Sequence, residues 1–363
     1  MNKRILEILR KIQIPDETVV ADTQKLLDNL TKPQGSLGKL ERIAKEVALI
    51  TGIPKPEVAK KIVVVFAADH GVAEEGVSAY PQEVTTQMVY NFLNKGAAIN
   101  VIAEHVGADV YVVDVGVKNE INFENKIKNV NFISKKINFG TKNFLKQQAM
   151  SYKEAEESIL VGIEVAEDIV KKYKVQDNKI PLIAIGEMGI GNTTAASLIT
   201  CVVCGISPRE SVGRGTGVDD YKYEHKLKVV EQVLEKYEFK FSDGIDILSK
   251  VGGYEIGGMV GVILAAAYHK IPVVLDGFIS TSSALIASCL CCKTVNYMIA
   301  GHVSQEPAHK IQLDFLGLKP ILDLDMRLGE GTGACLAMSI IELSCKILNN
   351  MATFESAGVS QKI

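Results

Sequence analysis

Five runs of the sequence that predict strands end in a carboxylate next to or close to a glycine. These acids are Asp69, Asp114, Glu187, Asp276 and Glu330. A carboxylate in a partly apolar pocket can act as a general base or stabilise a developing positive charge. Any one of them could instead cap a helix or brace a loop. As a set, they predict one or two functional carboxylates.

A glycine-rich stretch, residues 186–197 (GEMGIGNTTAAS), follows one of these runs and precedes a small-residue helical segment. Its spacing, Gly186-x4-Gly191-Asn192-Thr193, differs from a P-loop because Asn192 stands where the phosphate-reaching lysine belongs. Glycines let the backbone approach an anion, and the N–H groups of the following helix point at it. The stretch therefore favours a monophosphate over a triphosphate. The alternative is an ordinary strand–helix turn capped by Asn192 or Thr193.

Further polar residues predict a phosphate-binding rim. Arg214 and Lys226 lie in and after the glycine-rich VGRGTG stretch, and His302 and Ser304 lie in an expected loop. A group of hydroxyls at an expected helix start is better explained by capping; it consists of Ser280, Thr281 and Ser282.

The histidines and cysteines give no metal or redox signature. The 6 histidines are scattered, with no HExxH motif, so no metal site is expected. His70 either lines the predicted crevice or makes a structural hydrogen bond. Cys201 and Cys204 form a CxxC inside an apolar run, which favours core packing. No G-x-S-x-G elbow and no strand followed by GxGxxG is present, which argues against a hydrolase elbow and a dinucleotide site.

The elements that must position these groups alternate between strand-like and helix-like segments. Four nearly continuous apolar runs predict strands buried on both faces of a parallel sheet: 61–71, 108–116, 180–189 and 271–277. A fifth run, 319–331, alternates in polarity and predicts an edge strand or a strand end. Apolar residues at helical spacing predict helices in residues 82–106, 151–173 and 219–237. This order predicts a doubly wound α/β domain with ligands at the carboxyl ends of the strands.

The bulk composition is that of a soluble globular enzyme larger than one average domain. The chain has 363 residues, of which 47% are hydrophobic and 23% charged, with a net charge of −3. Neither a nucleic-acid surface nor a membrane segment is expected. The odd number of cysteines, 7, and the charged N-terminal segment predict a reduced cytoplasmic protein. Helical segments at 1–30 and 334–354 do not alternate with strands and predict a small helical unit.

Ordered motifs from about residue 30 to the C-terminus resemble one family, the nicotinate-nucleotide–dimethylbenzimidazole phosphoribosyltransferases. The motifs are KPQGSLGKLE (32–41), AADHGV (67–72), SAYPQEVT (78–85), GEMGIGNTT (186–194), VGRGTG (212–217), DGFISTSSAL (276–285), EPAH (306–309) and MRLGEGTGA (326–334). The resemblance implies transfer of the 5-phosphoribosyl group of nicotinate mononucleotide to 5,6-dimethylbenzimidazole, giving α-ribazole 5′-phosphate and nicotinate, in cobalamin nucleotide-loop assembly. It further implies a homodimer without a metal or organic cofactor.

The resemblance also implies a fold and a division of the chain. The expected fold is a Rossmann-like parallel sheet flanked by helices, with a small helical domain built from both chain ends. We expect 1–30 and part of 305–363 in the small domain, and 31–335 in the large one.

Site residues follow from the matching motif positions. The resemblance places the general base at Glu330 and a second carboxylate at Glu187. The expected phosphate and ribose contacts are Gly189, Gly191, Asn192, Thr193, Thr194, Lys226, Ser304, Gly331, Thr332 and Gly333. The expected base pocket consists of Tyr80, Met88 and Leu328.

Two features leave questions open. The segment with Gln147 and Gln148 departs from the family pattern, and Tyr80 and Met88 stand where members vary, so the acceptor base is not determined. The glycine loop alone also fits a P-loop-like nucleotide hydrolase or kinase, or a non-catalytic nucleotide-binding sensor.

Overall fold

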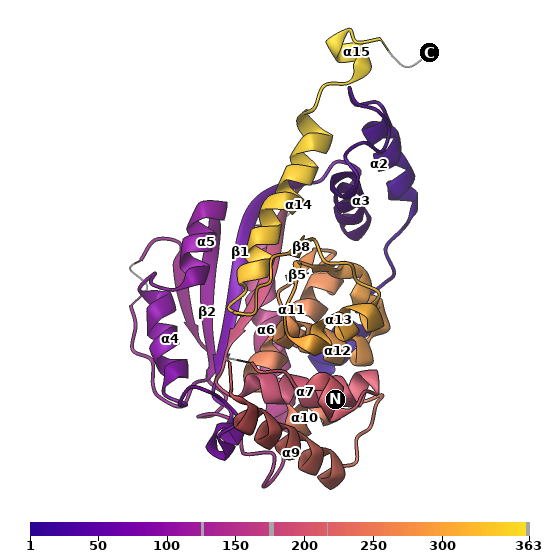
Figure 1. Cartoon of the computed structure of the whole chain (residues 1–363). Helices are drawn as coiled ribbons and strands as arrows, with labels where there is room; N and C mark the ends of the chain where they lie inside the picture. The colour runs from indigo at the N-terminus through magenta and orange to yellow at the C-terminus, as the bar shows by residue number, and fades with distance from the viewer. Residues whose placement is uncertain (125–126, 174–177, 216, 361–363) are drawn as a thin grey trace.

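A six-stranded parallel sheet forms the centre of the molecule (Figure 1). The computed structural model describes residues 1–124, 127–173, 178–215 and 217–360. The strand order is β3-β2-β1-β4-β5-β6, and every neighbouring pair is parallel. The strands are β1 Glu57–Ala68, β2 Ala108–Gly116, β3 Val130–Ser134, β4 Lys179–Met188, β5 Val273–Leu275 and β6 Met298–Ala300. The predicted α/β class with a Rossmann-like parallel sheet is confirmed.

The continuous apolar runs form the middle of this sheet because both of its faces are covered. All of β2 and the last eight residues of β1 are buried. The four predicted runs of this kind correspond to β1, β2, β4 and β5. β3 and β6 were not predicted; they lie at the two edges of the sheet, and β6 has only three residues.

The predicted fifth strand, 319–331, is wrong in extent. Only Leu322–Asp323 (β8) is extended, and it pairs with His302–Val303 (β7) in a separate two-stranded sheet. Leu322 packs partly against the core, but Leu324 is 53% exposed, so the alternating leucines do not form a buried face. Glu330 therefore lies in an irregular turn and not at the end of a main-sheet strand.

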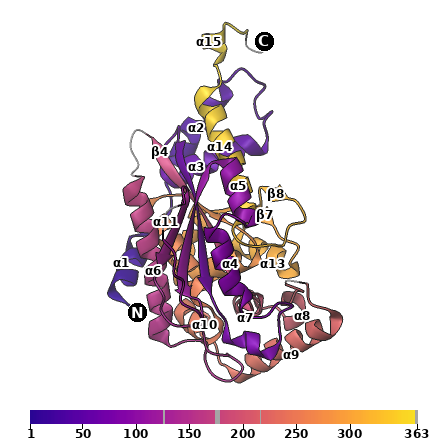
Figure 2. The ribbon, with the colours of Figure 1, turned by 90° about the vertical axis from the view of Figure 1, so that its left-hand side faces the viewer.

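Two pairs of helices cover the sheet on opposite faces (Figure 2). α6 (Tyr152–Lys172) and α11 (Tyr254–His269) lie on one face, and α5 (Ala98–Val106) and α14 (Thr332–Asn350) lie on the other. α6 and α11 pack backbone to backbone, because a Cβ added at Gly162 would lie 1.8 Å from the Gly258 carbonyl oxygen. The other helices are α1 Lys3–Lys11, α2 Thr18–Asp28, α3 Lys39–Thr51, α4 Val84–Leu93, α7 Asn192–Cys204, α8 Pro208–Ser211, α9 Asp220–Lys236, α10 Gly244–Val251, α12 Phe278–Leu290, α13 Pro307–Leu316 and α15 Phe354–Ala357, with short 3₁₀ helices η1 Gly71–Glu75 and η2 Cys292–Tyr297.

α14 is long and apolar enough to meet the criteria for a membrane span, but its apolar residues have another explanation. Of its most apolar 18-residue window, 56% is buried inside the protein. Ala334, Met338 and Ile341 belong to the main core, against β1 and β4. The composition of α14 is therefore that of a core helix.

A second, smaller hydrophobic cluster lies away from the sheet. It joins Leu27 and Leu30, at the end of α2 and just after it, to Ala44 of α3 and Leu348 near the end of α14. Figure 1 shows α2, α3, α15 and the end of α14 together beyond one end of the sheet. α1 lies elsewhere, against α6 and α11. The division of the chain into two domains, with the boundaries given above, stays a prediction.

Candidate active site

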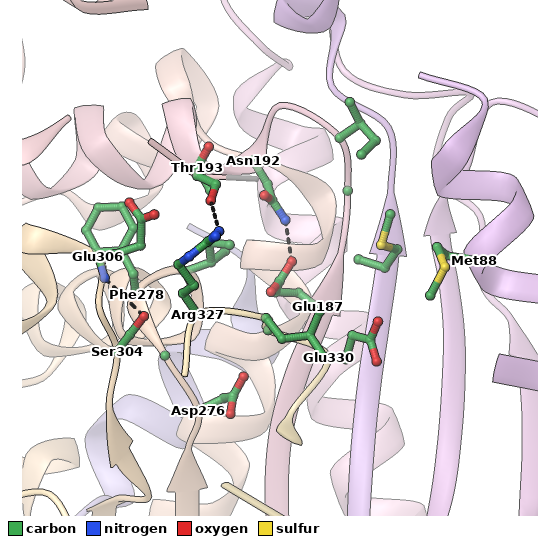
Figure 3. A pocket seen from close by; sticks show the side chains of 18 of the residues that line it. Met88, Glu187, Asn192, Thr193, Asp276, Phe278, Ser304, Glu306, Arg327 and Glu330 are labelled. Carbon is green, nitrogen blue, oxygen red and sulfur yellow. Dashed lines mark hydrogen bonds between the residues drawn. The ribbon is translucent and has the colours of Figure 1, made fainter. Parts of the chain in front are cut away.

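A cavity of about 360 Å³ opens at the carboxyl ends of β4 and β5 (Figure 3). Its walls come from the glycine loop after β4, the start of α12, the loop after β7, α4 and the turn before α14. Met88, Phe278 and Leu328 give part of the lining an apolar character. The cavity lies where ligands bind in open parallel sheets.

The turn before α14 carries Glu330 in an unusual backbone conformation. Gly329, Glu330 and Gly331 have φ of 86°, 63° and 82°, all in the left-handed region. A glutamate rarely adopts this conformation, and such residues cluster at functional sites. The turn lies directly on β4, because a Cβ added at Gly186 would lie 2.3 Å from the Gly331 nitrogen. Glycine at position 186 therefore permits the close approach that places Glu330 at the cavity.

The Glu330 carboxyl is buried but remains at the cavity wall. Its pKa is raised to about 7, mainly by burial; the Ile99 N–H opposes this shift and the charge of Asp276 adds to it. That N–H, at the start of α5, donates to Oε2 at 3.4 Å. A carboxyl with a pKa near neutrality can accept a proton from a substrate at physiological pH.

Asp276, after β5, holds the other side of the same turn. Its Oδ2 accepts the Gly331 N–H at 3.2 Å and its Oδ1 accepts the Ala334 N–H at 3.0 Å. His302 Nε2 lies 3.6 Å from Oδ1. Burial raises the pKa of Asp276, and His302 and the backbone N–H groups oppose that shift. Asp276 thus caps α14 from a neighbouring strand.

Glu187, near the end of β4, is the second carboxyl in the cavity wall. Burial raises its pKa to about 8, with further contributions from the charges of Glu255 and Asp276. The Asn192 side-chain amide donates to its Oε2. Figure 3 shows Asn192 pointing toward Glu187. The asparagine that replaces the P-loop lysine is therefore engaged with a carboxyl of the site.

A histidine–glutamate pair supports the glycine loop from behind. His70 Nε2 lies 2.6 Å from Glu255 Oε1, and both side chains are fully buried. A Cβ added at Gly191 would lie 3.3 Å from the His70 Cβ, and one at Gly189 would meet the His70 ring. His70 does not line the cavity, so of its two readings the structural one is correct.

A lysine reaches the first turn of α7 from a different helix. Lys226, on α9, donates from Nζ to Thr193 Oγ1 at 2.8 Å and to the Gly213 carbonyl oxygen at 3.3 Å. Burial lowers its pKa to about 8, although the charge of Glu306 opposes that shift. A buried ammonium group whose bonds to the described residues go to neutral oxygens is a strong site for an anion.

Similarity to known proteins decides the family. A phosphoribosyltransferase family model matches residues 12–359. The nicotinate-nucleotide–dimethylbenzimidazole phosphoribosyltransferase of Chloroflexus aggregans is 50% identical over 96% of this chain and 95% of its own length. The enzyme of that name from Geobacter sp. strain M21 is 51% identical over 97% of this chain and 98% of its own. The chain belongs to this phosphoribosyltransferase family.

Solved structures agree with that assignment. The crystal structure of CobT from Thermus thermophilus superposes with a TM-score of 0.88 and 43% sequence identity, covering 95% of this chain and all of that one. This phosphoribosyltransferase is therefore an enzyme of the glycosyltransferase type.

Most predicted site residues of the phosphoribosyltransferase line the cavity. Those that do are Glu187, Glu330, Gly189, Asn192, Thr193, Ser304, Tyr80, Met88 and Leu328. The others lie just behind them. Lys226 bonds to Thr193, the Thr332 hydroxyl donates to the Gly329 carbonyl oxygen, and a Cβ added at Gly333 would meet the His302 ring. The remaining residues behind the wall are Gly191, Thr194 and Gly331. What each residue contacts in a substrate stays a prediction.

Several cavity residues were missed. Asp276 stood at a predicted strand end beside Gly277, but it was ranked below Glu330 and Glu187. Arg327 directly precedes Leu328, and its Nη1 donates to the Gly215 carbonyl oxygen at 3.2 Å. Phe278, Met188 and Glu306 also line the cavity; they lie in the family motifs quoted above, but none of them was assigned a role.

The remaining predictions concern residues away from the cavity. Gln147 and Gln148 are exposed and are not part of the cavity wall. Thr216 of the VGRGTG stretch lies outside the described residues. Within the described ranges, no group of three or more His, Cys, Asp or Glu side chains is arranged to hold a metal ion.

Proposed function

We propose that this enzyme transfers the 5-phosphoribosyl group of nicotinate mononucleotide to a ring nitrogen of 5,6-dimethylbenzimidazole. The products are α-ribazole 5′-phosphate and nicotinate, and the configuration at C1′ inverts. The names of the relatives and the carboxyl, amide and apolar groups that line the cavity support this proposal. As the family resemblance implies, we also propose that the enzyme is a cytoplasmic homodimer.

The chemistry requires one base and no general acid. The pyridinium nitrogen of the donor is positively charged and becomes neutral as the C1′–N bond breaks. The acceptor nitrogen forms the new bond to C1′, and the acceptor ring becomes cationic unless its second nitrogen loses a proton. In the proposal, the Glu330 carboxylate takes that proton. Attack opposite the leaving group converts a β-glycosidic bond into an α one.

The position of Glu330 is the observation that carries the proposal. Its carboxyl lines a partly apolar cavity and has a pKa of about 7. Thr193 lies in the glycine loop, and Lys226 lies behind that loop and donates to Thr193. A flat aromatic base near Leu328 and Met88 and a phosphate near Thr193 would leave C1′ between them. Holding both reactants in line contributes much of the rate through effective molarity.

The P-loop alternative is weakened by the local contacts. Asn192 stands in place of the lysine and bonds to Glu187. The amino group near the loop comes from Lys226, on another helix. We therefore propose a monophosphate ligand here.

Product analysis tests the proposal directly. The wild-type enzyme is incubated with nicotinate mononucleotide and 5,6-dimethylbenzimidazole, and nicotinate release and the anomeric configuration of the product are measured. We expect acceptor-dependent release of nicotinate and an α-anomer. Release without acceptor, a β-anomer, or cleavage of ATP with Mg²⁺ in place of this reaction would overturn the proposal. A panel of other benzimidazoles and purines then identifies the preferred base.

A further inference from the structure

The buried imidazole of His309 contacts the loop that carries Ser304. His309 lies in the first turn of α13, is fully buried, and is not part of the cavity wall. The Ser304 backbone N–H donates to His309 Nδ1 at 2.8 Å. His309 Nε2 lies 2.9 Å from Thr281 Oγ1, in α12. The side chain therefore joins two segments that border the cavity.

The bond from the Ser304 N–H determines which atom donates in each of the other hydrogen bonds. A backbone N–H can only donate, so His309 Nδ1 must be the unprotonated acceptor nitrogen. The proton of the neutral ring then resides on Nε2, which donates to Thr281 Oγ1. The Thr281 hydroxyl in turn donates to the Gly277 carbonyl oxygen at 2.8 Å. One continuous chain of donors thus runs from Ser304 to Gly277, and both of these residues line the cavity.

The surroundings of His309 keep its imidazole ring in the neutral form. Burial, together with the charge of His302, lowers the pKa of His309 to about 3. The ring therefore stays neutral at physiological pH and cannot exchange protons with a substrate there.

The prediction that the hydroxyls of this region cap α12 is wrong. Ser280 and Thr281 both donate backward to the Gly277 carbonyl oxygen, and Gly277 itself is the N-cap.

A second contact ties α13 to the glycine loop. Gln312, one turn after His309 and fully buried, donates from Nε2 to Thr200 Oγ1 at 2.8 Å. Thr200 lies on α7, whose first turn holds Asn192 and Thr193. α13 is thus bonded to α12 and α7, whose N-terminal ends both reach the cavity. At the other side of the loop, Ser304 Oγ accepts the Glu306 N–H at 3.3 Å.

We propose that His309 and Thr281 are positioning residues that set the Ser304 loop for the phosphate or ribose of the donor nucleotide. The inference rests on the proposed function and on the contact between Ser304 and the phosphate or ribose that the family resemblance implies. Neither residue touches substrate. Their effect is to fix the Ser304 backbone relative to Gly277, so their loss weakens nucleotide recognition and leaves the acceptor end unchanged.

The test uses an isosteric pair of variants in the full-length enzyme. Thr281→Val keeps the side-chain volume but removes the hydroxyl, whereas Thr281→Ser keeps the hydroxyl and serves as the matched control. We expect Thr281→Val to raise the KM for nicotinate mononucleotide about 10-fold, with the KM for the base within about 2-fold of wild type, because one loop contact is misplaced. Thr281→Ser should stay near wild type for both substrates. An unchanged nucleotide KM in Thr281→Val overturns the proposal, including when its Tm falls.

A second comparison separates positioning from general destabilisation. In a Ser304→Ala background, Thr281→Val should change the nucleotide KM by no more than about 2-fold, because the Ser304 hydroxyl, whose position depends on the backbone that Thr281 helps to fix, is already absent. Full additivity overturns the proposal. His309→Asn, which keeps an acceptor near the Nδ1 position, should retain nucleotide affinity better than His309→Gln; the opposite order also overturns it.

Calorimetric binding of nicotinate mononucleotide distinguishes this inference from the proposed function. If the wild type binds the nucleotide but releases no nicotinate with any acceptor, the proposed reaction fails, and the binding constants of Thr281→Val and Thr281→Ser still decide the positioning role. If the wild type turns over and Thr281→Val binds as tightly as wild type, only the positioning role fails.

Discussion

Burial acts on groups of opposite charge at two ends of the site: the carboxyl end, with Glu187 and Glu330 in the cavity wall, and the amine end, with Lys226 behind that wall. At the carboxyl end, burial raises the pKa of Glu187 to about 8 and that of Glu330 to about 7. At the amine end, burial lowers the pKa of Lys226 to about 8. Burial therefore disfavours the charged form of each group, and a ligand of opposite charge can offset that free-energy cost.

The two ends differ in how rigidly the backbone holds the charged group. Glu330 lies in a turn of three successive left-handed residues that packs on β4, and its carboxyl accepts one N–H at 3.4 Å. Lys226 extends from a regular helix and is held by two short-range oxygen contacts of its ammonium group. A base must meet one proton in one direction, whereas an ammonium group can bind a phosphate from several directions. The difference in backbone conformation matches the difference between the two proposed tasks.

Loss of the base should give the largest effect. Glu330→Gln keeps the shape of the side chain but removes the basic oxygen, so we expect kcat to fall roughly 10²–10⁴-fold. The KM for nicotinate mononucleotide should stay near wild type, because the amine end is unaltered. Glu120→Gln, at an exposed position, is the control. Steady-state kinetics with both substrates measure the effect, and a wild-type kcat would remove Glu330 from the mechanism.

Loss of the Lys226 ammonium group should raise the KM for the nucleotide. Lys226→Met keeps an apolar stem of similar length, and we expect the nucleotide KM to rise roughly 30-fold or more, as when one partner of a buried charge contact worth about 2–5 kcal/mol is removed. Lys228→Met, exposed on the same helix, should behave as wild type. Equal losses of kcat in Lys226→Met and Glu330→Gln would show that the two ends do not have separate tasks.

The pH dependence of kcat/KM should report the protonation of both Glu330 and Lys226. Glu330 must lose its proton, and Lys226 must keep its own, so kcat/KM for the nucleotide should be bell-shaped with limbs near the pKa values of about 7 and about 8. Asp276→Asn removes a charge that raises the pKa of Glu330, and should move the acidic limb to lower pH. Rate measurements from about pH 5 to about pH 10 test this. An acidic limb that stays in place in Asp276→Asn would contradict the electrostatic coupling.

The smallest effect should be a gain in stability. The folded-state pKa of Glu187 lies above its ordinary value of 4.5, at about 8, so the folded protein binds this proton more tightly than the unfolded chain does. Stability from this group is full below pH 4.5 and is lost as the pH rises toward 8. Glu187→Gln mimics the protonated group, and we expect its Tm to exceed that of wild type by roughly 2–5 °C at about pH 8 and to match it near pH 4.5. Thermal unfolding at both pH values, with Glu120→Gln as control, measures this. A lower Tm at the higher pH would contradict it.

The central sheet could be predicted because its signal is local. Strands β1 and β4 are buried along most of their length, so their apolar runs are nearly unbroken and cannot be confused with amphipathic elements. β6, with three residues, is too short to show a pattern. The alternation at 319–331 predicted a strand, but the glycines that flank Glu330 favour a turn with positive φ, and that conformation overrode the strand.

The candidate site was predictable in part. Glu187 and Glu330 were among five acids noted beside glycines, although Glu330 lies in a turn and not after a main-sheet strand, and the family resemblance selected these two. Lys226 was noted after the VGRGTG stretch, and the resemblance assigned it to the phosphate. Asp276 carried the same local signal as Glu187, but its role depends on bonds to Gly331 and Ala334, which lie more than fifty residues away. His309 gave no signal, because its function is set by partners on two other segments.

The length of α14 links the carboxyl end of the cavity to the far end of the molecule. Its 19 residues span about 28 Å. Its first turn follows Glu330 and is capped by Asp276, and Leu348 near its last turn is buried with Leu27 and Ala44. The two ends of one helix are thus held by separate contacts, and the cluster around Leu348 anchors the helix whose first turn follows the proposed base.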